Sequence, residues 1–106
     1  MIYKKLINAI ILISFSFTAS ATEHLVEQKD KAFTKTEITI KVGDTIKFRN
    51  ADPYNHNIFS LSDLKMFDLG SFPHGESRNV VFDKVGEAEV ECAIHPSMLL
   101  KVKVTE

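Results

Sequence analysis

One short run of the sequence carries three side chains that bind soft metal ions. Cys92, His95 and Met98 stand three positions apart, and a second histidine, His56, lies well upstream. A thiolate, two imidazoles and a thioether are the ligand set of a trigonal copper site for electron transfer. Soft sulfur ligands favour Cu(I), imidazole also accepts Cu(II), and a weak axial thioether tunes the balance between them. The pattern therefore predicts a copper site formed by these four residues.

Each of these residues has a simpler explanation when it is taken alone. Cys92 is the only cysteine of the chain and could be a small buried hydrophobic residue. Met98 could be a core residue, and His56 could be an ordinary polar residue of a loop. The three side chains of the run lie together between two predicted strands, which favours a metal site over three independent roles.

Two further histidines are assigned to other roles. His24 would lie in a flexible tail near the mature N-terminus, although a free amine followed by a histidine at position three can also bind Cu(II). His74 is interpreted as a surface residue of a loop, with a position near the copper end as the alternative.

The first residues are typical of an export signal. Lys4 and Lys5 precede an apolar stretch from residue 6 to residue 17, and Ala19 and Ala21 give a small-residue cleavage pattern. We expect a signal peptide over residues 1–21 and one domain over residues 22–106, in the periplasm. An uncleaved anchor is the alternative, but the apolar stretch is shorter than the roughly 20 residues of a spanning helix.

The composition excludes several classes of protein. Without Lys4 and Lys5 the 13 basic residues fall to 11, against 14 acidic ones, which leaves a net charge of −3. No basic stripe is present, so we expect no binding to nucleic acid.

A single cysteine in an exported chain cannot form an internal disulfide, which leaves a reactive thiol, a buried residue or a metal ligand. We also expect a monomer without stable membrane insertion.

The remaining chain has the pattern of short strands separated by turns. Polar and apolar residues alternate, as in half-buried strands, over residues 37–42, 45–50, 77–82, 87–92 and 100–104. Residues 37–50 are interpreted as a β-hairpin turning at Gly43-Asp44, with Ile38, Ile40, Val42, Ile46 and Phe48 facing inward.

Three other segments are less regular. Residues 25–33 are expected to form a first strand, residues 58–59 to start a short strand, and residues 61–75 to form a loop-rich crossing with room for one helical turn. Turns at regular intervals predict an all-β fold, a Greek-key antiparallel β-sandwich of seven to eight strands.

These elements would position the four ligands at one end of the sandwich. A strand of period two places Cys92 on the inward face with Val90, at the end of its strand. His95 would lie at the tip of the following loop and Met98 on its return. His56 would come from a different loop at the same end.

The chain resembles small cupredoxins of the plastocyanin, amicyanin and pseudoazurin group over essentially all of residues 22–106. Residues 38–48 resemble the second and third strands of the family, and His56-Asn57 resembles its first ligand with the adjacent asparagine. Residues 92–98 resemble the short ligand loop of amicyanin and pseudoazurin. Residues 67–70, with Pro73 and residues 75–77, look closest to plastocyanin-like proteins for methylamine utilisation.

The resemblance implies one copper ion bound by His56, Cys92, His95 and Met98. It implies that Asn57 braces the ligand loop near Cys92 and that His95 is the more exposed imidazole, through which the electron leaves. Ile94 and Glu91 depart from the residues that many relatives carry there. These departures affect the reduction potential and the docking surface.

We therefore expect a periplasmic electron carrier and no enzyme. Its partners would be redox proteins that dock transiently near His95, against an apolar ring formed by Pro96, Leu99 and Phe72. A copper-binding or copper-delivery protein is the main alternative. A fragment of a copper oxidase or nitrite reductase, and a structural sandwich with an incidental thiol, are two further alternatives.

Overall fold

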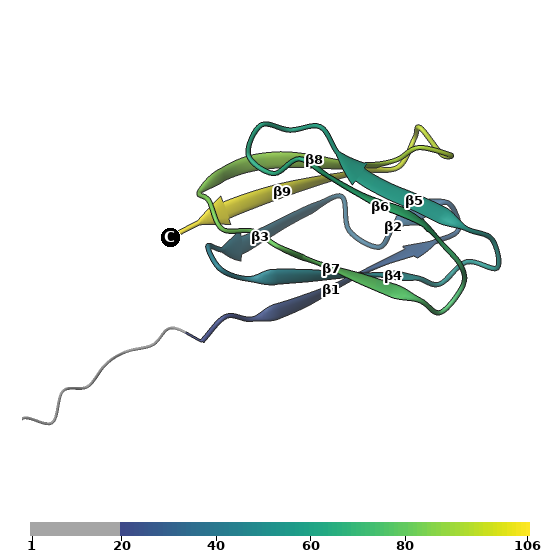
Figure 1. Cartoon of the computed structure of the whole chain (residues 1–106), viewed down its shortest axis with the longest axis horizontal. Helices are drawn as coiled ribbons and strands as arrows, with labels where there is room; N and C mark the ends of the chain where they lie inside the picture. The colour runs from purple at the N-terminus through teal and green to yellow at the C-terminus, as the bar shows by residue number, and fades with distance from the viewer. Residues whose placement is uncertain (1–19) are drawn as a thin grey trace, which may run out of the picture.

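Nine strands form two sheets in a computed structural model, which describes residues 20–106 (Figure 1). Residues 1–19, which hold most of the predicted signal peptide, lie outside the described part. One sheet has the order β2-β1-β4-β7, and the other has the order β3-β9-β8-β5-β6. The strands of the first sheet are β1 (Glu23–Lys29), β2 (Ala32–Phe33), β4 (Thr45–Asn50) and β7 (Ser77–Val81). Those of the second are β3 (Glu37–Lys41), β5 (His56–Ser60), β6 (Phe67–Phe72), β8 (Gly86–Cys92) and β9 (Leu99–Thr105).

The two sheets pack face to face, which confirms the predicted all-β sandwich. Most neighbouring strands are antiparallel, but β1 runs parallel to β4 and β3 runs parallel to β9. The sandwich is therefore mixed and not purely antiparallel. In the described residues no helix is long and apolar enough to cross a membrane.

Inward-facing residues of both sheets form one hydrophobic core. In β8 the residues Ala88, Val90 and Cys92 are buried while Glu87 and Glu89 are exposed, as the alternation predicts. Strands β3, β4 and β9 follow the same rule. The fully buried aromatic and branched side chains that fill the core include Val26, Ile46, Phe48, Ile58, Phe72, Leu100 and Val102.

The predicted hairpin over residues 37–50 is wrong. β3 pairs with β9 in one sheet, whereas β4 pairs with β1 and β7 in the other. The turn at Gly43, whose φ is +92°, therefore crosses between the sheets. Val42 lies in this crossing and is 42% exposed, so its predicted inward position is wrong as well.

Two irregular segments also differ from the expectation. Residues 61–75 contain the edge strand β6 and no helical turn, and β6 pairs with β5 across a register shift between Asn57 and Phe59. Residues 25–33 form two strands, since the chain reverses at Asp30 and Lys31.

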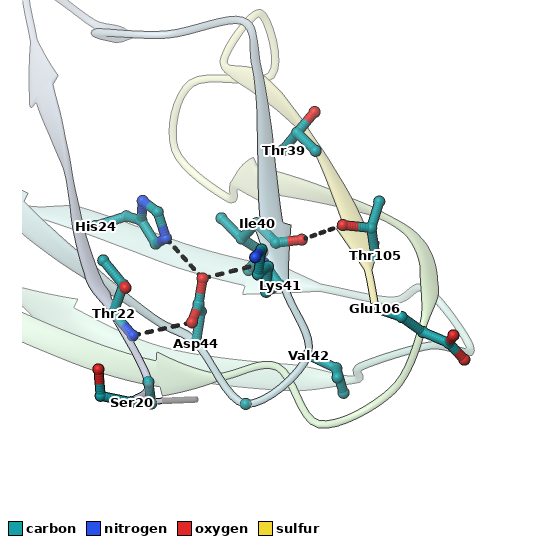
Figure 2. Close-up of a pocket in the computed structure, with 12 residues that line it drawn as sticks. Ser20, Thr22, His24, Thr39, Ile40, Lys41, Val42, Asp44, Thr105 and Glu106 are labelled. Atoms are coloured by element: carbon teal, nitrogen blue, oxygen red, sulfur yellow. Dashed lines mark hydrogen bonds and ion pairs between the residues drawn. The ribbon is translucent and has the colours of Figure 1, made fainter. Parts of the chain in front are cut away.

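Asp44 ties the start of β1 to the crossing between the sheets (Figure 2). Its carboxylate accepts hydrogen bonds from the N–H groups of Thr22 and Lys41, and it lies 2.9 Å from His24 Nε2. The hydrogen bond from Thr22, with those from His24 and Lys41, lowers the pKa of Asp44 to about 2. This cluster borders a hollow of about 770 Å³ at the end of the sandwich where β1 begins.

Candidate metal centre

The predicted ligands come from two strands and one loop that meet at the other end of the sandwich. His56 is the first residue of β5 and Cys92 is the last residue of β8, while His95 and Met98 lie in the loop that leads into β9. Because β5 runs antiparallel to β8, with Ile58 opposite Cys92, the start of one strand lies beside the end of the other. Sheet pairing therefore brings His56 to Cys92.

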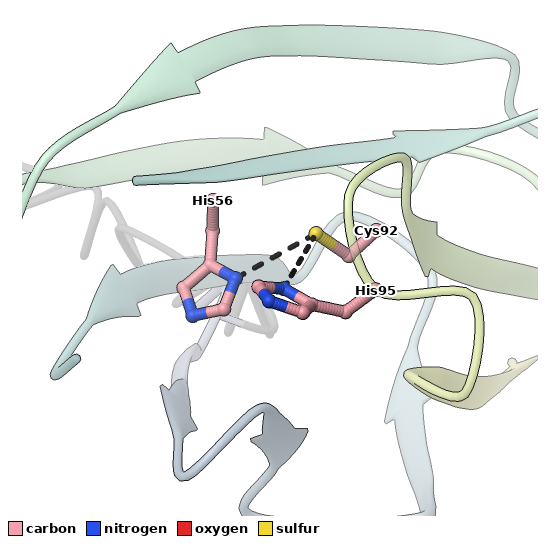
Figure 3. Close-up of side chains that lie close together, drawn as sticks. All are labelled: His56, Cys92 and His95. Carbon is pink, nitrogen blue, oxygen red and sulfur yellow. Dashed lines mark hydrogen bonds between the residues drawn. The ribbon is translucent and has the colours of Figure 1, made fainter. Parts of the chain in front are cut away.

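Three of the four donor side chains converge on one point (Figure 3). The Sγ atom of Cys92 lies 3.6 Å from His56 Nδ1 and 3.9 Å from His95 Nδ1. The three donor atoms all lie within 4.8 Å of one another. Both imidazole rings present their Nδ1 atoms to the sulfur.

These spacings fit a trigonal metal ion. Bonds of about 2.0 Å to nitrogen and about 2.3 Å to a thiolate, as zinc shows, separate the two donors by about 3.7 Å when they lie about 120° apart. The observed distances of 3.6 and 3.9 Å match this value. The donor set, two imidazoles and a thiolate, suits copper.

Met98 occupies a position that suits the fourth ligand. It is 1% exposed, and its N–H donates to the carbonyl of His95 at 2.9 Å, which closes the ligand loop as a turn. An exposed loop would not normally bury a methionine that follows Pro96 and Ser97, both of which are exposed. The turn thus directs the thioether to the interior at the same end as the other donors.

The chain matches the family model described as copper binding proteins, plastocyanin/azurin family, over residues 20–105. The chain belongs to this family of copper-binding cupredoxins. No curated protein is similar enough in sequence to count as a match.

Solved structures with the same fold include an amicyanin, another cupredoxin and a copper-containing nitrite reductase. A reduced amicyanin variant has a TM-score of 0.73 and 22% identity, covering 78% of this chain and 82% of that one. A purple cupredoxin from Nitrosopumilus maritimus has a TM-score of 0.68 and 21% identity, covering 81% of this chain and 100% of that one. A copper-containing nitrite reductase from Thermus scotoductus has a TM-score of 0.72 and 27% identity, covering 77% of this chain. This cupredoxin spans only 22% of the reductase.

Burial differs among the predicted ligands of this cupredoxin. His56 is fully buried and Cys92 is 2% exposed, whereas His95 is partly exposed. The prediction that His95 is the more exposed imidazole agrees with this burial. Tyr54 contacts both histidines, since its ring centroid lies 5.5 Å from the centroid of each imidazole.

The surface around His95 is apolar, but one predicted member is absent from it. Ile94 is 54% exposed, Leu99 is 47% exposed and Pro96 is also exposed. Phe72 is fully buried, so its predicted place in an exposed ring is wrong. It lies opposite His56 in the β5–β6 pair and faces the core.

Asn57 braces the ligand loop through its main chain. Its carbonyl oxygen accepts a hydrogen bond of 2.9 Å from the N–H of Ala93, the residue after Cys92. The side-chain Oδ1 of Asn57 is buried without a hydrogen-bond partner in the described part of the chain. The brace implied by the resemblance is thus present, and the backbone provides it.

The sequence analysis missed Asn50, which shapes the loop before His56. Its side-chain amide donates to the carbonyls of Tyr54 and Phe72, and its Oδ1 accepts from the N–H of Asp52. Asn50 is fully buried, so these bonds are shielded from water. No feature of the sequence distinguishes this asparagine from an ordinary loop residue.

Asp52 is the second residue that the sequence analysis missed. Its Oδ2 lies 2.7 Å from His56 Nε2, and the carboxylate is almost fully buried. Burial acts to raise the pKa of Asp52, but the hydrogen bonds from His56 and from the N–H groups of Asp30 and Lys31 outweigh it and keep this pKa below its ordinary value. The carboxylate is therefore ionised at neutral pH.

The other two histidines lie at opposite ends of the sandwich. His74 Nδ1 lies 2.9 Å from the main-chain oxygen of Asp52, which places His74 near the ligand end. His24 pairs with Asp44 at the far end and belongs to strand β1. It is therefore not part of a flexible tail.

Proposed function

We propose that this cupredoxin is an electron carrier that binds one copper ion through His56, Cys92, His95 and Met98. When bound, the copper would accept and release single electrons as it alternates between Cu(II) and Cu(I). The observation that supports this role most strongly is the unequal burial of the ligands. His56, Cys92 and Met98 are at most 2% exposed, and His95 alone is partly exposed.

This burial suits electron transfer better than metal exchange. A delivery protein must pass its ion to a partner, which requires the partner's ligands to approach the metal. Here strands β5 and β8 enclose two of the donors, and the imidazole of His95 is the one that reaches the surface. An electron can leave through that ring while the ion stays in place.

The test is the visible absorption spectrum of residues 22–106 with one equivalent of Cu(II). We expect an intense blue band from thiolate-to-copper charge transfer, and the Cys92→Ser variant should lose it. Ser97→Ala, which alters an exposed residue of the same loop, is the matched control and should keep the band. A colourless wild-type complex would contradict the proposal.

Copper delivery is the second candidate function, and retention of Cu(I) separates it from electron transfer. The buried site of an electron carrier should release Cu(I) only slowly to an excess of chelator. This slow release should persist after many cycles of oxidation and reduction. Rapid and complete transfer to the chelator would instead favour delivery.

We propose that redox partners dock on the apolar surface formed by Ile94, Pro96 and Leu99. Redox encounter complexes have small and weak interfaces, so a patch of a few apolar residues suits this kind of docking. On the β8–β9 face, Glu87 and Glu89 lie opposite Lys103 and Lys101, so charges of both signs are interspersed. This mixture favours docking by apolar contact over long-range steering by charge.

We also propose that the protein is exported to the periplasm as a monomer and acts without enzymatic activity. Cleavage after Ala21 would leave the nitrogen of Thr22 as a free amine, 2.9 Å from Asp44 Oδ1. The carboxylate would then pair with the new amine. The test is N-terminal sequencing of the protein recovered from the periplasm of a Gram-negative host; a mature chain that begins at Met1 would contradict the cleavage.

A further inference from the structure

Asp52 has a buried carboxylate that accepts hydrogen bonds from the turn between β1 and β2 and from His56. Its Oδ1 accepts from the N–H of Asp30 at 2.7 Å, and its Oδ2 accepts from the N–H of Lys31 at 3.2 Å and lies 2.7 Å from His56 Nε2. The residue is 2% exposed. A buried carboxylate is tolerated only when it is satisfied in this way.

The bond to His56 assigns the two nitrogens of that ring. Nδ1 faces the sulfur of Cys92, whereas Nε2 lies on the opposite side against the carboxylate. Nε2 must therefore carry the hydrogen, because a carboxylate can only accept, and Nδ1 is left with its lone pair directed at the metal site. A partner of this kind fixes the tautomer and orientation of a histidine ligand and makes it more basic.

The turn between β1 and β2 donates hydrogen bonds to the same carboxylate. Asp30 and Lys31 both adopt left-handed backbone conformations, with φ of 54° and 58°. Two successive left-handed residues direct adjacent N–H groups to one side, and here both groups reach Asp52. This hairpin turn contains no glycine, although such turns strongly prefer one, so a specific contact must hold its conformation.

We propose that Asp52 is a positioning residue that holds His56 by Nε2 and lowers the reduction potential of the bound copper. The inference rests on the proposed copper site. A nearby negative charge and a more basic imidazole both stabilise Cu(II) relative to Cu(I). The electron in this comparison comes from an electrode, which reduces Cu(II) to Cu(I) without any other reactant.

The experiment measures the reduction potential of the copper-loaded wild type, Asp52→Asn and Asp83→Asn by spectroelectrochemistry. The Asp52→Asn amide has one acceptor oxygen and no charge, so it cannot satisfy both His56 and the turn. Removing a partner of a ligating histidine typically costs 10-fold or more in metal affinity. We expect the preference for Cu(II) over Cu(I) to fall about tenfold, which is about 59 mV upward for one electron.

Asp83→Asn is the matched control, since it removes an exposed carboxylate from the loop between β7 and β8 and should leave the potential unchanged. A potential for Asp52→Asn equal to that of the control would overturn the inference. The blue band of the wild type reports on the copper site separately, so its absence would count against the proposed function.

A second measurement keeps the inference testable if Asp52→Asn fails to fold. In NMR spectra of the wild-type Cu(I) protein, which is diamagnetic, we expect a slowly exchanging proton on His56 Nε2. A ring with no protected Nε2 proton would show that Asp52 does not hold His56.

Discussion

The two sulfur ligands lie at the ends of one seven-residue segment but differ as donors. Cys92 provides a thiolate at the end of a rigid strand, whereas Met98 provides a neutral thioether from the turn that follows. Both are buried, at 2% and 1% exposure. At the scale of single residues, the sequence singles out these donors because a thiol and a thioether at this spacing have few joint explanations other than a metal site.

Met98→Leu should raise the reduction potential and keep the blue colour. The change removes a donor that assists Cu(II), and a tenfold loss of preference for Cu(II) corresponds to about 59 mV. The two side chains have similar volumes, so we expect a loss of unfolding free energy below about 1.5 kcal/mol. Met66→Leu, at a position that is 67% exposed, is the control and should not change the potential. An unchanged potential in Met98→Leu would exclude Met98 as a ligand.

Asp52 and Asn50 show what single residues in a sequence do not reveal. Both are polar residues near Pro53, which is the ordinary composition of a loop. Their burial and their bonds to His56, Tyr54 and Phe72 depend on how β1, β5 and β6 pack around the loop. The sequence therefore indicates candidate ligands but not the residues that hold them.

At the scale of elements, alternation predicts the strands but not the sheet to which each belongs. Strands β3, β4, β8 and β9 bury the residues that a period of two selects. A short turn such as Gly43-Asp44 can close a hairpin or cross between sheets, and local sequence does not decide between the two. The edge strand β6 was not predicted because its apolar residues, Phe67, Leu69 and Phe72, do not keep a period of two past Gly70, whose φ is +68°.

The turn between β1 and β2 provides a test of backbone conformation. A left-handed conformation costs a residue with a Cβ atom about 1–2 kcal/mol, so Lys31→Gly should be more stable than Lys31→Ala by about 1 kcal/mol. In strand β1 the order should reverse, with Lys29→Gly less stable than Lys29→Ala by about 0.5–1 kcal/mol. Urea unfolding of the four variants measures both differences. The same order at both positions would argue against a left-handed Lys31.

Asp44 should make the stability of the metal-free protein depend on pH in the acid range. Its folded pKa of about 2 lies below the ordinary aspartate value of 3.8, so the ionised form stabilises the fold above about pH 4. That contribution should be lost as the pH falls from about 4 to about 2. The carboxylate also bonds to Thr22 and Lys41, which Asp44→Asn would disturb.

Thermal unfolding of the wild type and Asp44→Asn between pH 7 and pH 2 measures this effect. The gap in Tm between the two proteins should be largest above pH 4 and narrow below it. A gap that stays constant to pH 2 would show that the charge of Asp44 contributes nothing.

At the scale of the whole molecule, the two ends of the sandwich have different roles. The ligand end carries the four predicted metal-binding side chains and an exposed apolar surface, while the far end carries the hydrogen bonds of Asp44 (Figure 2). Strands β5, β8 and β9 connect the ends and hold the ligands from both sides of the loop. A rigid scaffold of this kind favours electron transfer, because the ligands need to move little between the two oxidation states.

Leu99→Lys should slow electron exchange between two copies of the protein. The change puts a positive charge on the surface around His95, so two such surfaces repel each other when they meet. We expect the self-exchange rate, measured by NMR line broadening in mixtures of both oxidation states, to fall several-fold with the potential unchanged. Val85→Lys, at an exposed position before β8, is the control and should not slow exchange. Equal slowing by both variants would place the contact elsewhere.

Cyclic voltammetry of the copper-loaded protein tests the central claim most directly. An electron carrier with buried ligands should give a reversible one-electron wave that persists over repeated cycles, with copper retained throughout. An irreversible wave, with copper lost on reduction, would contradict the account and favour a protein that transfers the metal itself.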